Sequence, residues 1–166
     1  SLRLSSDDMR EIRYAALLHD FGKVGVRENV LVKANKLYPG ELELIEARFR
    51  ALYGQRETAH LRTLLDAARR GLPLPQDYEQ ALAAELSELE RFLEFVRECN
   101  RPTVLEAGSF ERLHEVAQLH YRNHCGEECP LLLPLELERL SIPRGSLDQR
   151  ERLEIESHVT HTFRFL

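Results

Sequence analysis

The chain has 166 residues, of which 43% are hydrophobic and 31% are charged, and its formal net charge is -5. A chain of this length can form one hydrophobic core but is short for two, so we expect one domain. Acidic and basic residues are interleaved, so there is no basic patch to attract polyanions over long range. This pattern disfavours a nucleic-acid-binding module and a nucleic acid duplex as partner.

Membrane and secretory segments are not predicted. No stretch approaches the roughly 18 to 20 uninterrupted apolar residues that a membrane-spanning helix needs, and the N-terminus lacks the apolar segment of a signal peptide. The three cysteines have no disulfide-framework spacing, which fits a reducing compartment. We therefore expect a soluble, cytoplasmic protein without membrane insertion.

The first predicted element is a helix over residues 5–21, SSDDMREIRYAALLHDF. Ser5 or Ser6 is a suitable N-cap, acidic residues follow in the first turn, and Gly22 is a suitable stop. His19 and Asp20 then lie in the last turn of this helix.

Two long helices follow a loop, over residues 39–71 and 76–100. Pro39 suits the first turn of the former and Gly71 suits its end. A Pro-containing linker joins the two, so they should form an antiparallel hairpin. We expect packing between two sets of apolar residues: Leu82, Leu86, Leu89, Leu93 and Val96 on the second helix, and Leu61, Leu64 and Leu65 on the first. The alternative for this seam is a dimer interface.

Three elements are predicted in the rest of the chain. Residues 109–125 read as a third helix, residues 130–145 as a Pro-broken irregular segment, and residues 146–166 as a last helix. Ser146 or Asp148 caps that helix, with Glu151 three residues after the latter. No segment has the period of a strand, so the predicted fold class is all-α.

The stretch LLHDFGKVG, residues 17–25, carries the most specific chemistry. Imidazole suits iron, manganese and zinc, a carboxylate can bridge two ions, and a metal ion makes water a nucleophile at neutral pH. Lys23 is placed to meet a phosphoryl oxygen. The structural alternative is that His19 interacts with the helix C-terminus and Asp20 forms a surface ion pair with Lys23.

The wider pattern AALLHDFGKVGV resembles the H-D-x-G-K signature of the HD-GYP family, metal-dependent phosphohydrolases best known as cyclic di-GMP phosphodiesterases. The stretch IPRGSLDQRERLEIESHVTHTFRFL looks like the second block of that family, a capped helix with a further metal-binding histidine, which falls on His158. The similarity covers roughly residues 12–37 and 142–166.

The resemblance implies an HD-type helical domain with a binuclear centre of Fe, Mn or Zn. By this resemblance His19, Asp20 and His158 are metal ligands, Asp20 is the bridging, catalytic carboxylate, and Lys23 is a catalytic phosphate contact. The substrate would be a cyclic dinucleotide or another phosphoester. His161, three residues after His158, is an alternative ligand on the same helical face.

Two departures from the family affect the predicted domain organisation. His19 and His158 are 139 positions apart (158 − 19), whereas in the family the second block follows the first almost directly. We therefore expect one partial HD-type domain over residues 1–166, with a helical insertion over residues 40–140. The remaining family ligands would lie beyond Leu166, so the chain reads as a fragment that is inactive alone.

A rival metal site and a rival function remain. The rival site is a structural zinc in HYRNHCGEEC, where the histidines would share a helix face, with candidate ligands His120, His124, Cys125 and Cys129. His60 and His114 are expected to be solvated. The rival function is a degenerate HD-type module that acts as a sensor or helical interaction domain. A homodimer through the insertion or an exposed, truncated core is a further expectation.

Overall fold

The computed structural model describes residues 5–18, 21–73 and 77–165, and residues 159–165 by their backbone alone. Its α-helices are α1 (Ser6–Leu18), α2 (Glu28–Leu31), α3 (Pro39–Arg70), α4 (Tyr78–Asn100), α5 (Ser109–Ala117), α6 (Pro134–Leu140) and α7 (Gln149–Phe165). A 3-10 helix, η1 (Phe21–Gly25), precedes α2, and β1 (His120–Arg122) pairs antiparallel with β2 (Glu128–Pro130). Helices hold 69% of the residues, which confirms the all-α prediction. None of the described helices has the length and apolar character needed to cross a membrane.

The contacts between residues divide the chain into two compact units. One unit comprises Ser1–Ala34 with Leu147–Leu166, and the other comprises Asn35–Ser146. The second unit is continuous in sequence and the first is made of two distant segments. Whether the second unit is an insertion into an HD-type domain stays a prediction.

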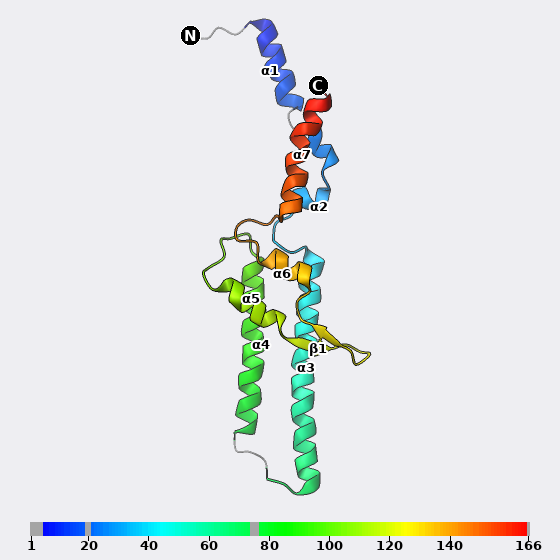
Figure 1. Cartoon of the computed structure of the whole chain (residues 1–166), viewed down its shortest axis with the longest axis vertical. Coiled ribbons are helices and arrows are strands. Elements are labelled where there is room, and N and C mark those ends of the chain that lie inside the picture. The colour runs from blue at the N-terminus through cyan, green and yellow to red at the C-terminus, as the bar shows by residue number, and fades with distance from the viewer. Residues whose placement is uncertain (1–4, 19–20, 74–76, 166) are drawn as a thin grey trace. The chain divides into compact units, whose positions relative to one another are not determined.

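The long hairpin predicted from sequence is present in the second unit, where α3 and α4 lie side by side (Figure 1). Pro39 begins α3, as expected for a residue without a backbone N–H, and Glu41 accepts a hydrogen bond from the backbone N–H of Tyr38 at 2.9 Å. Gly71 ends α3 with φ of 63°, a left-handed conformation that glycine adopts without steric penalty. Both ends of α3 therefore match their predicted signals.

The predicted packing of the hairpin is only partly correct. Leu89 and Val96 of α4 are buried, but Leu61 and Leu65 of α3 are 62% and 51% exposed. The buried positions of α3 lie closer to its start, where α5, α6 and the segment after β2 add to the core. These core residues include Ile45, Phe49, Leu52, Leu113, Val116, Leu131 and Leu140.

The prediction of one helix over residues 109–125 is wrong beyond residue 117. The chain turns instead into the β1–β2 hairpin, whose connection is organised by Asn123. Its side-chain oxygen accepts hydrogen bonds from the backbone N–H groups of Cys125 and Glu127 at 2.9 and 3.0 Å. Gly126 has φ of 82°, which only glycine adopts readily. These hydrogen bonds and the left-handed Gly126 favour a turn at this point of the chain.

The prediction of an irregular segment over residues 130–145 is also wrong in part. Pro134 stands at the start of α6, a position at which proline is compatible with a helix. Glu136 accepts a hydrogen bond from the backbone N–H of Leu133 at 2.7 Å and so caps the new helix. The proline therefore begins a helix where a break was expected.

The first unit is built around α7. α7 packs against η1 and contacts α2, and Val26 and Val30 are buried. α1 belongs to the same unit, and among its described residues none is buried. At the start of α1, the backbone N–H of Ser5 donates to the Asp8 carboxylate at 2.7 Å and the backbone N–H of Asp8 donates to Ser5 Oγ at 3.1 Å, which confirms the serine cap.

Candidate metal centre

The residues predicted to bind metal are described unequally. His19 and Asp20 lie outside the described residues. Lys23 is half-buried in η1, and His158 is half-buried in α7. Because η1 packs against α7, the structure brings the segment that directly follows the His-Asp pair onto the helix that carries His158. The two blocks of the resemblance thus meet in one unit, although they stand far apart in the sequence.

The imidazole of His158 is oriented by its own helix. Its Nδ1 contacts the backbone carbonyl oxygen of Ile155. A carbonyl oxygen only accepts hydrogen bonds, so Nδ1 is the donor in this contact. Histidines that bind metals commonly donate their second ring N–H to a carbonyl in this way. In the neutral ring this contact leaves the lone pair on Nε2, the atom through which such a histidine binds a metal.

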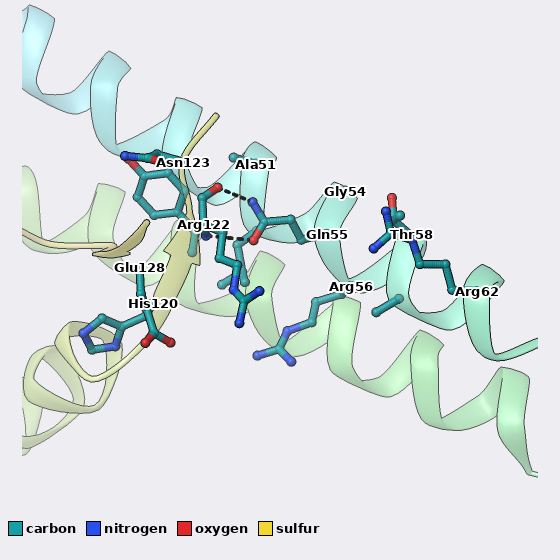
Figure 2. Close-up of a pocket in the computed structure, with 13 residues that line it drawn as sticks. Ala51, Gly54, Gln55, Arg56, Thr58, Arg62, His120, Arg122, Asn123 and Glu128 are labelled. Atoms are coloured by element: carbon teal, nitrogen blue, oxygen red, sulfur yellow. Dashed lines mark hydrogen bonds between the residues drawn. The ribbon is translucent and has the colours of Figure 1, made fainter. Parts of the chain in front are cut away.

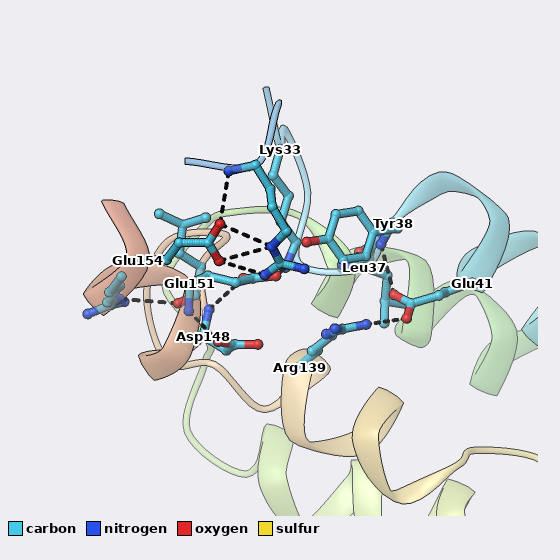
Figure 3. A network of polar contacts seen from close by, with 12 residues as sticks. Lys33, Leu37, Tyr38, Glu41, Arg139, Asp148, Glu151 and Glu154 are labelled. Atoms are coloured by element: carbon cyan, nitrogen blue, oxygen red, sulfur yellow. Dashed lines mark hydrogen bonds and ion pairs between the residues drawn. The ribbon is translucent and has the colours of Figure 1, made fainter. Parts of the chain in front are cut away.

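A buried ion pair fixes the first turn of α7. Lys33 Nζ donates to both carboxylate oxygens of Glu151 at 2.8 and 2.7 Å, and the two side chains are 1% and 2% exposed (Figure 3). Glu151 and Asp148 also exchange hydrogen bonds of 2.9 Å with each other's backbone N–H, which confirms the predicted capping box at Asp148. No local sequence pattern predicts the role of Lys33, because its partner Glu151 is 118 positions away.

A second, more exposed pair joins the two segments of this unit one turn later. Arg27 donates from its Nη2 to Glu154 at 2.7 Å and from its Nε at 3.0 Å, and its backbone N–H donates at 2.9 Å. The side-chain hydrogen bond from Arg27, followed by the backbone one, holds the pKa of the Glu154 carboxyl below its usual value. Together the two pairs set the position of α7 relative to the chain that follows η1.

The structure does not have the helix on which the alternative zinc site was predicted. His120 lies in β1 and His124 in the following turn, so these two histidines share no helix face. His120 Nδ1 donates to the carbonyl oxygen of Gln118 at 2.8 Å, and Cys125 Sγ lies 3.2 Å from His124 Nε2. Throughout the described part of the chain, no three His, Cys, Asp or Glu residues gather in a group that could hold a metal ion.

The other histidines are also placed. His60 was expected to be solvated, but it is half-buried and stacks on Tyr78 with ring centroids 3.9 Å apart. His114 is exposed on α5, as predicted. The side chain of His161 lies outside the described residues.

A cavity of about 800 Å³ lies in the second unit, between α3 and β1, and sequence reasoning did not anticipate it (Figure 2). The sequence does contain a turn signal, Asn123 followed by Gly126. The strands on either side have only three residues each, too few to show a strand period.

Comparison with known proteins identifies no relative. A scan against models of protein families finds no match. Searches of the curated proteins and of the solved structures also return no significant similarity.

Proposed function

We propose that the chain is the N-terminal part of a metal-dependent phosphohydrolase catalytic domain of the HD-GYP type, acting in the cytoplasm on a phosphodiester such as cyclic di-GMP. The support is the order and chemistry of the two sequence blocks, together with one structural observation. η1, which directly follows His19 and Asp20, packs against α7, which carries His158.

The proposal gives each residue a role. His19, Asp20 and His158 would hold the metal, with Asp20 as the bridging carboxylate. When bound, a divalent metal supplies a water molecule that ionises at neutral pH and can attack phosphorus. Lys23 offers a cation to the substrate phosphate. The Lys33–Glu151 pair holds α7, and hence His158, in register with η1.

The described donor set fits this role only as one part of a larger site. Of the three proposed metal ligands, only His158 has a described side chain, and its Nδ1 contact to a backbone carbonyl is of the kind that metal-binding histidines make. A binuclear centre needs more protein ligands than His19, Asp20 and His158 supply. We therefore expect the 166 residues to bind a divalent ion weakly, and to hydrolyse cyclic di-GMP negligibly.

Metal titration tests the proposal. Mn²⁺ favours imidazole and carboxylate over thiolate, so isothermal titration with Mn²⁺ reports on the proposed ligands and not on the hairpin cysteines. We expect H158A and D20A each to weaken Mn²⁺ binding at least about tenfold. The matched control is H114A, which removes an exposed histidine of α5.

Three results would contradict the proposal. Equal Mn²⁺ binding by the wild type, H158A and D20A would remove these residues from the ligand set. Failure of the wild type to bind Mn²⁺ even at millimolar concentration would favour the degenerate module, which keeps the fold and acts through protein contacts. Efficient hydrolysis of cyclic di-GMP by the 166 residues would show that the ligand set was misjudged.

A further inference from the structure

The cavity between α3 and β1 is formed by short side chains on one stretch of α3. Ala51, Gly54, Thr58 and Ala59 line it and recur at helical spacing. A Cβ atom added at Gly54 would meet no atom within 4 Å, so the space beside this residue is open. The helix therefore presents a hollow where longer side chains would fill the gap beside β1.

Gln55 fixes β1 over this hollow. Its Nε2 donates to the backbone carbonyl oxygen of Arg122 at 2.6 Å, and its Oε1 accepts from the backbone N–H of Arg122 at 2.9 Å (Figure 2). The amide thus bonds the strand edge as a neighbouring strand would. Because the backbone of Arg122 is held at two points, its side chain leaves the strand from a fixed position at the rim of the cavity.

The lining carries an excess of positive charge. Arg56, Arg62 and Arg122 line the cavity, and Glu128 is the acidic residue among its described lining. Arg56 pairs with Glu85 at 3.0 Å, but both side chains are 44% exposed, so this pair neutralises it only weakly. In the described part of the chain, the guanidinium groups of Arg62 and Arg122 have no ion-pair partner. The described lining thus holds three arginines against one carboxylate, a local positive charge in a chain of net charge -5.

We propose that this cavity binds a phosphate-bearing small molecule, with Arg62 and Arg122 as its anion contacts. The planar guanidinium group donates two parallel hydrogen bonds to a phosphate, a geometry that lysine cannot offer. Gln55, which holds Arg122, stands seven residues before Arg62, so these contacts are spaced about 10 Å along α3. A diphosphate is shorter than this spacing. The long side chains of Arg62 and Arg122 must therefore reach toward each other to share one diphosphate ligand.

The size of the cavity favours a small molecule over an acidic protein segment. Its volume of about 800 Å³ lies within the roughly 300–1,000 Å³ typical of small-molecule sites. The lining residues of α3 run only from Ala51 to Arg62. None of the lining residues belongs to the unit that carries Lys23 and His158, so this proposal does not depend on the metal site.

Binding of inorganic pyrophosphate tests the proposal. Titration followed by ³¹P NMR, in EDTA so that no metal contributes, should show saturable binding by the full chain. R62Q and R122Q should each weaken it by about tenfold or more, as expected for hydrogen bonds to a charged group. The matched control R69Q removes an exposed arginine of the same helix outside the cavity and should leave the affinity unchanged.

A steric variant tests the location independently of charge. G54L should fold, because leucine favours a helix more than glycine and the added side chain enters open space. It should also abolish pyrophosphate binding, whereas G40L, at another open glycine of α3, should bind like the wild type. The absence of binding to the wild type, or equal binding by G54L, R62Q and R122Q, would overturn the proposal. Stronger binding of a polyglutamate peptide than of pyrophosphate would assign the cavity to acidic proteins instead and would also overturn it.

Discussion

The two ends of the α3–α4 hairpin differ sharply in how they are held together. At its base, residues 39–55 and 86–100, the two helices share a core with α5, α6 and the segment after β2. At its tip, residues 56–70 and 78–85, the contacts include a stacked His60–Tyr78 pair, a hydrogen bond of 3.2 Å from the Tyr78 hydroxyl to the His60 carbonyl oxygen, and the exposed Arg56–Glu85 ion pair. Among the leucines of α3, Leu52 near the base is buried, whereas Leu61 and Leu65 at the tip are 62% and 51% exposed.

This difference shows what helical periodicity can and cannot predict. An apolar stripe indicates a helix with a face to bury, but burial also requires another layer to cover that face. The covering layer here comes from residues 105–142, far from α3 in sequence. The base should therefore carry most of the stability of the second unit, and the tip should tolerate change.

Matched aliphatic truncations test this comparison most strongly. I45A removes a fully buried side chain at the base and should lower the free energy of unfolding by roughly 2–5 kcal/mol. L65A makes a similar truncation on the same helix at the tip and should change it by no more than about 0.5 kcal/mol. Urea denaturation monitored by circular dichroism measures both values. Equal losses would show that the tip is as well packed as the base.

Ion pairs at the base should also contribute more to stability than ion pairs at the tip. Their effects should be smaller than those of the aliphatic truncations. Arg48 at the base binds both carboxylate oxygens of Glu136 at 2.6 Å, and the two side chains are only 11% and 5% exposed. E136Q should cost about 1.5–3 kcal/mol, because it leaves a buried guanidinium with a neutral partner. E85Q, which breaks the exposed Arg56–Glu85 pair at the tip, should cost about 0–1 kcal/mol. A larger loss for E85Q in urea denaturation would reverse the proposed ranking.

The base should also give the hairpin a dependence on alkaline pH. Burial raises the pKa of the Cys99 thiol from 9.0 to about 11, with the positive charge of Lys36 opposing this shift. Since the unfolded thiol loses its proton first, stability is complete below pH 9 and declines as the pH rises toward 11. The decline should be on the order of 1–2 kcal/mol relative to C99V.

Lys36 must be separated from this effect. Its ammonium group is fully buried, and desolvation lowers its pKa, so it adds stability as the pH rises. Because C99V retains Lys36, the difference between the wild type and C99V reports the thiol together with its electrostatic coupling to Lys36. If the difference in unfolding free energy between the wild type and C99V stays constant from pH 8 to pH 11, Cys99 is not buried as described.

Local signals predicted the long elements well. Pro39 and Gly71 mark the ends of α3, and Asp148 with Glu151 marks the start of α7, because caps depend on residues within one turn. The β1–β2 hairpin was missed because three-residue strands carry no period, and α6 was missed because Pro134 was taken as a break. The arginine-lined cavity depends on that missed hairpin, so it could not be predicted either.

The candidate metal site shows the same limit. The motif points to His19, Asp20 and His158, but no local pattern predicts the Lys33–Glu151 and Arg27–Glu154 pairs that join the two segments. Such partners meet only once the chain has folded. Their positions therefore had to come from the structure.

The central claim, that two distant segments build one metal site, is tested most directly by NMR of the histidine ring nitrogens during a Zn²⁺ titration. We expect the resonances of His19 and of Nε2 of His158 to shift together over the same Zn²⁺ concentrations, with His60 and His114 unchanged. Metal binding at one shared ion requires the two rings to respond as a pair. A shift of His158 without His19, or one confined to His124 beside Cys125, would contradict the claim.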